Sequence, residues 1–263
     1  MLDHFDDQRT IFVTGKGGVG KSTVTAALGR AFADRGERVL VAETATYSAM
    51  SSLLGTDLPS EEPAAVDPPL YGVELEASTC FVEALHDFLP SRKVIRTLVD
   101  NRVARVFFDA APGINEFAIL NQIDRYLEQG AEENPDWDRV IVDLPASGHA
   151  VTFLGVPETY VDLMKVGPIA DRAGTLADRI RDPTRTALVA VALPEQMPVN
   201  ETVELEQGLR NQLDRELTVV ALNMLHRSPL DPDQREQFEQ MVQAIDHDEL
   251  VTDPLARPDD RQT

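Results

Sequence analysis

The residues best suited to chemistry form a glycine-rich run that contains two lysines and a serine. The run reads Gly15-Lys16-Gly17-Gly18-Val19-Gly20-Lys21-Ser22-Thr23. Its glycines let backbone N–H groups turn toward an anion without a Cβ clash. Lys21 is suited to neutralising phosphate oxygens, and the Ser22 hydroxyl is suited to ligating Mg²⁺. These residues therefore predict a phosphate-binding loop for ATP and Mg²⁺.

The elements around this run would hold it at the edge of a sheet. An apolar run at 10–14 precedes it and predicts a buried strand, while residues 22–34 carry apolar side chains at helical spacing. The next apolar run, 38–43, predicts a second strand that ends at Glu43. Strand, loop, helix and strand in this order indicate an α/β fold, a doubly wound, mostly parallel sheet in a three-layer α/β/α arrangement.

A second carboxylate with a plausible role follows another apolar run. Residues 137–143 predict a strand that ends in Asp143, and ligands of open α/β sheets bind at the carboxyl ends of strands. Asp143 is therefore a candidate metal residue together with Ser22. The alternative is an aspartate that only caps the end of the strand. Apolar runs at 186–193 and 217–222 predict two further strands, and Asn223 follows the second.

Residues 76–134 interrupt the alternation of strands and helices with helical patterns, which predicts a helical insertion within a single domain of residues 1–263. Its apolar side chains are expected mostly to pack on the sheet and on each other. A groove for the helix of a hydrophobic client protein is the alternative. The residues concerned are Phe81, Val82, Leu85, Phe88, Phe107, Phe108, Ile114, Phe117, Leu120 and Ile123.

Composition narrows the possible partners. The net charge of −21 argues against a nucleic-acid surface and against anionic membranes. The lone Cys80 excludes an intramolecular disulfide and a thiolate cluster. The amino terminus lacks a signal-peptide pattern, and no apolar stretch approaches the roughly 20 residues of a membrane span. We expect a cytoplasmic protein without an integral membrane segment.

Two motifs carry a resemblance to a known family. The loop with its early Lys16 resembles the deviant Walker A loop of the ParA, MinD, nitrogenase-iron-protein and ArsA class. The segment Asp143-Leu144-Pro145-Ala146-Ser147-Gly148-His149 with Phe153-Leu154 is similar to the Asp-Thr-Ala-Pro-Thr-Gly-His…Phe-Leu segment of the ArsA family, with Pro and Ala in swapped order. The resemblance implies a dimer in which Lys16 reaches the nucleotide of the partner. It also implies that Asn223 contacts the adenine, and that Lys16 and Lys21 are catalytic.

The chain departs from this family after its second strand. Where the family has an aspartate that positions the attacking water, this chain has Ala45. A methyl group cannot orient water, so either Glu43 takes over as the catalytic carboxylate, or hydrolysis is slow, or a partner subunit carries it out. We expect an ATPase that binds ATP and hydrolyses it slowly, as a homodimer or as a heterodimer with a related ArsA-like subunit. The dimer would act as a nucleotide-dependent switch on a client or partner protein.

Two other functions remain open at this point. A positioning ATPase of the ParA or MinD type would need a basic face or a membrane-binding helix, and the acidic composition supplies neither. A kinase or synthetase with the same loop would need an acceptor site, for which the sequence has no pattern. The sequence identifies neither the client nor the rate of hydrolysis.

Overall fold

The computed structural model describes residues 2–5, 7–44, 49–60, 62–88, 111–131, 134–225, 231 and 233–237. Residues 1–224 form one compact unit and residues 225–263 form a second. The single domain over 1–263 and the insertion at 76–134 stay predictions. In the second unit, residues 233–237 are helical.

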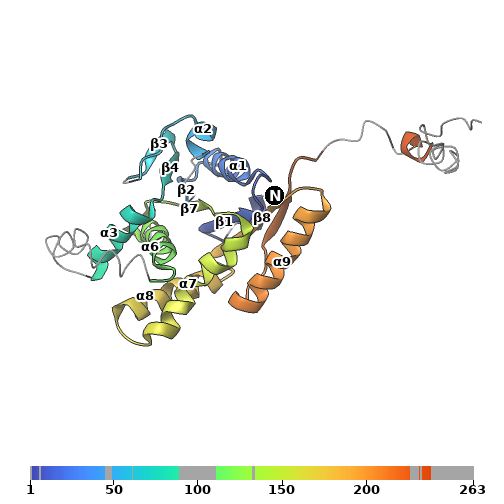
Figure 1. Cartoon of the computed structure of the whole chain (residues 1–263). Coiled ribbons are helices and arrows are strands. Elements are labelled where there is room, and N and C mark those ends of the chain that lie inside the picture. Colours follow the sequence, from blue (N-terminus) through green and yellow to red (C-terminus); the bar gives the residue numbers. More distant parts are fainter. Residues whose placement is uncertain are drawn as a thin grey trace, which may run out of the picture. The chain divides into compact units, whose positions relative to one another are not determined.

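A seven-stranded sheet forms the centre of the first unit (Figure 1). All neighbouring strands in it are parallel except the antiparallel pair at one edge, which confirms the predicted mostly parallel α/β fold. In spatial order the strands are β3 (Ala64–Asp67), β4 (Leu70–Glu74), β2 (Val39–Glu43), β7 (Arg139–Asp143), β1 (Thr10–Gly15), β8 (Thr186–Ala192) and β9 (Val219–Leu222).

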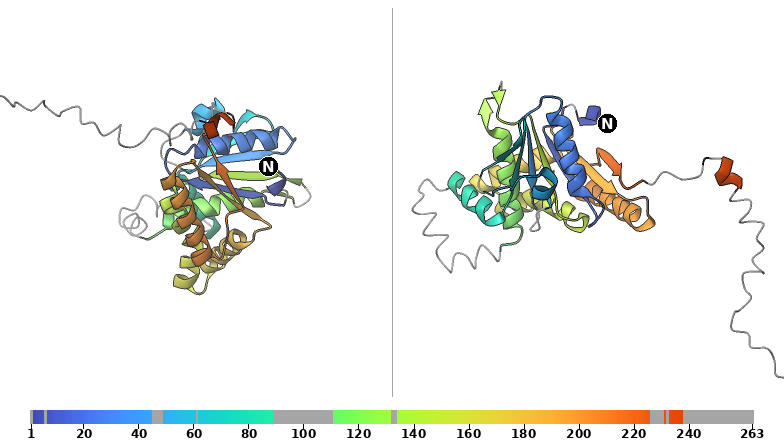
Figure 2. Two further views of the ribbon diagram at one scale, coloured as in Figure 1. Left: turned by 90° about the vertical axis from the view of Figure 1, so that its right-hand side faces the viewer. Right: turned by 90° about the horizontal axis from the view of Figure 1, so that it is seen from above.

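Helices cover both faces of the sheet, and Figure 2 shows the layers from two further directions. Helix α1 (Lys21–Ala33) and the short α2 (Met50–Leu54) contribute to the core on one face. The other face is covered by α6 (Ile114–Glu128), α7 (Ser147–Met164), α8 (Pro168–Arg181) and α9 (Gln196–Leu213). The remaining elements are α3 (Ala77–Phe88), a 3₁₀ turn at Leu2–Phe5 and the small hairpin of β5 (Gly130–Ala131) and β6 (Asn134–Pro135).

The central strands are buried along their whole length because both faces of the sheet are covered. Every residue of β1, β2, β7 and β8 is buried. Parallel strands buried on both faces appear in a sequence as continuous apolar runs, which is why these four were predictable. Their carboxyl ends lie at one edge, with Val13 and Glu43 both opposite Asp143 in the register.

The helical block between β4 and β7 contributes to the core. Phe117, Leu120 and Ile123 of α6 are each at most 4% exposed and lie in the cluster beneath the sheet. Phe81 and Ile114 are half-buried and pack against that cluster. Val82 and Leu85 are also half-buried. Core packing is therefore the observed role of Phe117, Leu120 and Ile123. The side chain of Phe88 and residues Phe107 and Phe108 lie outside the described part of the chain.

Among the described residues, no helix combines the length and the apolar character needed to cross a membrane. The cytoplasmic location stays a prediction.

Candidate functional site

The glycine-rich loop lies between the carboxyl end of β1 and the first turn of α1. Gly15, Gly18 and Gly20 have φ angles of 147°, 85° and 90°, in the region that favours glycine. A Cβ on Gly15 would lie 2.3 Å from the backbone oxygen of Val191, and a Cβ on Gly20 would lie 2.4 Å from Nδ2 of Asn223. The loop therefore requires glycine at these two positions for lack of space as well as for conformation.

The loop opens onto the amino-terminal end of α1. Gly20 is the N-cap residue and has no side chain with which to accept hydrogen bonds from the first amide groups of the helix. Unsatisfied N–H groups and the helix dipole together favour an anion at such an end. The local structure thus suits a phosphate group.

Both lysines of the loop have partners within the chain. The Lys21 ammonium donates a hydrogen bond to the backbone oxygen of Lys16 at 3.3 Å. Burial lowers the pKa of Lys21, and the charge of Asp143 opposes that effect. The Lys16 ammonium lies 2.7 Å from Oε1 of Glu201, on α9. Glu201 was not a predicted site residue, and no local pattern connects it with a loop 185 positions earlier.

Ser22 and Asp143, the two candidate metal residues, are in contact. The Ser22 hydroxyl donates a hydrogen bond to Oδ2 of Asp143 at 2.5 Å. Asp143 is 2% exposed, and within the described residues its buried Oδ1 has no hydrogen-bond partner. Burial raises the pKa of Asp143, while the Ser22 hydrogen bond and the Lys21 charge act in the opposite direction. A hydroxyl beside a buried carboxylate oxygen without a partner is a suitable donor set for Mg²⁺.

Thr44 connects the end of β2 with Asp143. Its backbone N–H and its hydroxyl both donate hydrogen bonds to the backbone oxygen of Asp143, at 3.2 and 2.7 Å. Sequence reasoning missed this contact, although the register of two strand ends could have suggested it.

Glu43 is fully buried, and its Oε1 accepts a hydrogen bond from the Ala49 N–H at 3.1 Å. Ala45 lies outside the described residues.

Asn223 approaches the loop from the end of β9. Its Nδ2 donates a hydrogen bond to the backbone oxygen of Val19 at 2.9 Å. The structure therefore brings Asn223, the loop, Ser22 and Asp143 to one edge of the sheet. His149, from the similar segment after Asp143, is exposed in the first turn of α7.

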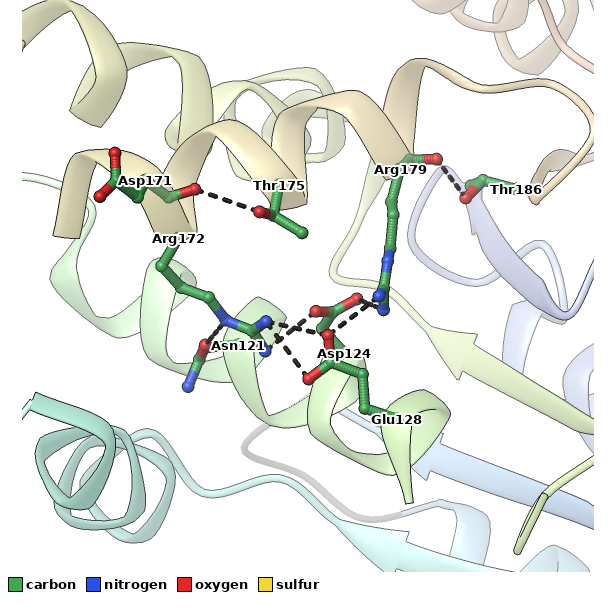
Figure 3. Close-up of polar contacts among 8 residues, drawn as sticks. All are labelled: Asn121, Asp124, Glu128, Asp171, Arg172, Thr175, Arg179 and Thr186. Atoms are coloured by element: carbon green, nitrogen blue, oxygen red, sulfur yellow. Dashed lines mark hydrogen bonds and ion pairs between the residues drawn. The ribbon is translucent and has the colours of Figure 1, made fainter. Parts of the chain in front are cut away.

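A second charged cluster joins α6 to α8 (Figure 3). Asp124, which is 3% exposed, pairs with Arg179 and with Arg172, the latter at 2.9 Å. Glu128 pairs with the same two guanidinium groups at 3.1 and 2.9 Å. Arg172 also donates a hydrogen bond to Oδ1 of Asn121 at 2.6 Å. Two carboxylates and two guanidinium groups balance in charge, so the cluster supports helix packing rather than anion binding.

This cluster lies away from the loop. The backbone oxygen of Arg179 accepts a hydrogen bond from the Thr186 hydroxyl at 2.8 Å, and Thr186 is the first residue of β8. The phosphate loop follows the opposite, carboxyl ends of the strands. The two charged regions are therefore separate.

A glycine-rich loop between a buried strand and a helix, with a carboxylate at the end of the neighbouring parallel strand, defines a P-loop nucleotide-binding protein. Residues 8–176 match the model of the anion-transporting ATPase family, ArsA. The chain belongs to the ArsA ATPase family, as its motifs predicted.

Individual relatives agree with this assignment. The chain is 29% identical over 233 residues to ATPase BagA of Mycobacterium tuberculosis, and the aligned region covers 85% of this chain and 67% of that protein. It is 24% identical over 262 residues to ATPase ARSA1 of Chlamydomonas reinhardtii, covering 77% of this chain and 33% of the relative. It is 22% identical over 262 residues to ATPase GET3C of Arabidopsis thaliana, covering 80% and 66%. The chain thus spans between one third and two thirds of the length of these relatives.

Proposed function

We propose that this protein binds ATP with Mg²⁺ in the loop at 15–23, hydrolyses it slowly and dimerises around the nucleotide. The observation that carries this proposal is the hydrogen bond between Ser22 and the buried Asp143, next to a loop that accommodates only glycine at positions 15 and 20. A half-buried hydroxyl and a buried carboxylate beside an uncapped helix end are suited to holding Mg²⁺ next to a phosphate group.

Each residue has a role in this proposal that follows from its position. The loop amides and Lys21 would bind the phosphates, and Ser22 and Asp143 would hold Mg²⁺, directly or through water. When bound, Mg²⁺ neutralises charge that develops on the phosphate oxygens. Asn223, with its Nδ2 bonded to Val19, would keep its Oδ1 for the exocyclic amine of adenine.

Slow hydrolysis follows from the residues at the end of β2. Ala45 cannot orient a water molecule, and the Glu43 carboxylate is buried and accepts a hydrogen bond from Ala49. Glu43 would have to exchange this partner before it could act on water. The dimer, formed with an identical or a related ArsA-like subunit, would switch a client or partner protein by binding and release of nucleotide.

Nucleotide binding and turnover test the proposal directly. The wild-type protein should bind a fluorescent ATP analogue in the presence of Mg²⁺, whereas Lys21→Ala and Asp143→Asn should bind it at least about tenfold more weakly. Steady-state phosphate release should be slow in the wild type and should rise at least about tenfold in Ala45→Asp. Absence of nucleotide binding by the wild type would refute the proposal. Rapid turnover by the wild type, with no increase in Ala45→Asp, would refute only the claim that this protein hydrolyses ATP slowly.

A further inference from the structure

The ion pair between Lys16 and Glu201 connects the phosphate loop with α9. Lys16 extends from the loop directly after Gly15, and Glu201 lies in the second turn of α9. Strand β8 pairs with β1 up to Gly15 and leads into α9, so the fold itself brings this helix to the loop. The 2.7 Å separation of the two charged atoms is that of a charge-assisted hydrogen bond.

Glu201 is held in place by the packing of its helix. Leu205, Leu209 and Leu213 of α9 are each at most 5% exposed and belong to the core beneath the sheet. Lys16, by contrast, is a long side chain on a loop whose neighbours are glycines. The helix that carries Glu201 is therefore fixed, whereas Lys16 lies on a loop and is the member of the pair that can change position.

The pair is suited to being exchanged. The two side chains are 36% and 32% exposed, so water can solvate both charges if they separate. Ion pairs of this kind are worth at most about 1 kcal/mol, whereas a fully buried pair would be much harder to break. A nucleotide phosphate offers Lys16 a stronger negative charge than a single carboxylate does.

We propose that Glu201 is a positioning residue for Lys16. The Glu201 carboxylate holds the Lys16 ammonium within the same subunit until a nucleotide phosphate replaces the carboxylate as the partner of Lys16. This inference rests on the proposed nucleotide-dependent dimerisation. It assigns to α9 a role that neither the loop motif nor the family assignment contains. While the pair persists, Lys16 cannot support the dimer, so Glu201 raises the nucleotide concentration that dimerisation requires.

Glu201→Gln tests this inference with Glu204→Gln as the matched control. Glu204 is an exposed carboxylate on the same helix, three residues further along. Dimer formation would be followed by light scattering during titration with Mg²⁺ and the non-hydrolysable analogue AMPPNP. We expect Glu201→Gln to lower the half-maximal AMPPNP concentration by about two- to fivefold, the range that an exposed ion pair can produce. Glu204→Gln should match the wild type.

A general reduction of negative charge near the nucleotide would also favour binding, and the Lys16→Ala background separates the two causes. If Glu201 acts through Lys16, Lys16→Ala and the double variant Lys16→Ala/Glu201→Gln should have the same AMPPNP affinity and the same dimer fraction. Equal shifts from Glu201→Gln in both backgrounds would overturn the inference. So would an unchanged or raised midpoint in Glu201→Gln alone, or an equal shift in Glu204→Gln.

The wild type separates failure of this inference from failure of the proposed function. If the wild type binds AMPPNP and dimerises but Glu201→Gln behaves identically, only the role of Glu201 is refuted. If the wild type neither binds AMPPNP nor dimerises, the proposed function fails and this inference fails with it.

Discussion

At the scale of single residues, the shape of the phosphate loop depends on two glycines that lie against other parts of the chain. Gly15 adjoins the backbone of β8, and Gly20 adjoins the side-chain amide of Asn223. A backbone neighbour cannot move aside as a flexible side chain can. Gly15 is therefore the less replaceable of the two.

Gly15→Ala should lower the free energy of unfolding by about 2–4 kcal/mol, because its Cβ would collide with the Val191 oxygen. Urea denaturation followed by circular dichroism would measure the loss. Gly17→Ala is the control, since a Cβ there meets nothing within 4 Å, and its effect should stay within about 0.5 kcal/mol. Equal stability of the two variants would contradict the close approach of β8 to the loop.

Asp143 should make stability without nucleotide depend on pH. Burial raises the pKa of this carboxyl, so between its ordinary and its raised pKa the folded state binds more protons than the unfolded state. Stability from this group is therefore present at low pH and is lost as the pH rises through that interval. Ionised Asp143 thus costs stability at neutral pH, as functional residues often do.

Asp143→Asn should accordingly raise the melting temperature at pH 7 in the absence of Mg²⁺ and nucleotide, while weakening nucleotide binding. Thermal unfolding of both proteins between pH 4 and 8 would show the difference growing with pH. Asp171→Asn, an exposed position on α8, is the control and should change little. A lower melting temperature for Asp143→Asn across the whole pH range would rule out this explanation.

At the scale of elements, α6 and α8 are joined by charges as well as by apolar packing. Asp124 is almost completely buried between two guanidinium groups that are 17% and 25% exposed. Burial alone would raise the pKa of Glu128, but hydrogen bonds and charge from Arg172 and Arg179 lower it. Removing Asp124 would leave two partly buried cations with Glu128 as their remaining carboxylate in this cluster.

Asp124→Asn should therefore destabilise the protein by about 2–3 kcal/mol, somewhat less than the loss expected for a fully buried pair. Chemical denaturation would measure this, with Asp178→Asn on the exposed side of α8 as the control. Nucleotide affinity should be unchanged in the folded variant, because the cluster lies near the amino-terminal end of β8 and the loop lies at the carboxyl ends of the strands. A loss no larger than that of the control would show that apolar contacts alone hold α6 to α8.

At the scale of the whole molecule, the proposed function predicts that nucleotide stabilises the fold. At a nucleotide concentration one hundred times the dissociation constant, the free energy of unfolding should rise by about 2.7 kcal/mol. Dimerisation would add a dependence of the melting temperature on protein concentration. Differential scanning calorimetry with Mg²⁺ and AMPPNP would measure both effects. Lys21→Ala should lose them, and equal stabilisation of that variant would place the nucleotide elsewhere.

The sequence by itself determined the elements whose signals are local. Strands β1, β2, β7 and β8 are continuous apolar runs because both faces of each strand are buried. The glycine spacing of the loop and the aspartate at the end of β7 lie beside these runs. Strand, loop, helix and carboxylate were therefore predictable without knowledge of how the strands are ordered.

Only the tertiary structure decided which distant residues meet. The pairs Lys16 with Glu201, Asn223 with Val19, and Asp124 with the arginines of α8 join positions far apart in the chain. It likewise placed Phe117, Leu120 and Ile123 in the core, where the apolar pattern had left a client groove open. The spacing of apolar residues predicts which side of a helix or strand is buried, but it does not predict which other element covers that side. The order of the strands and the packing of the helices determine which element that is, because they alone bring remote side chains within bonding distance.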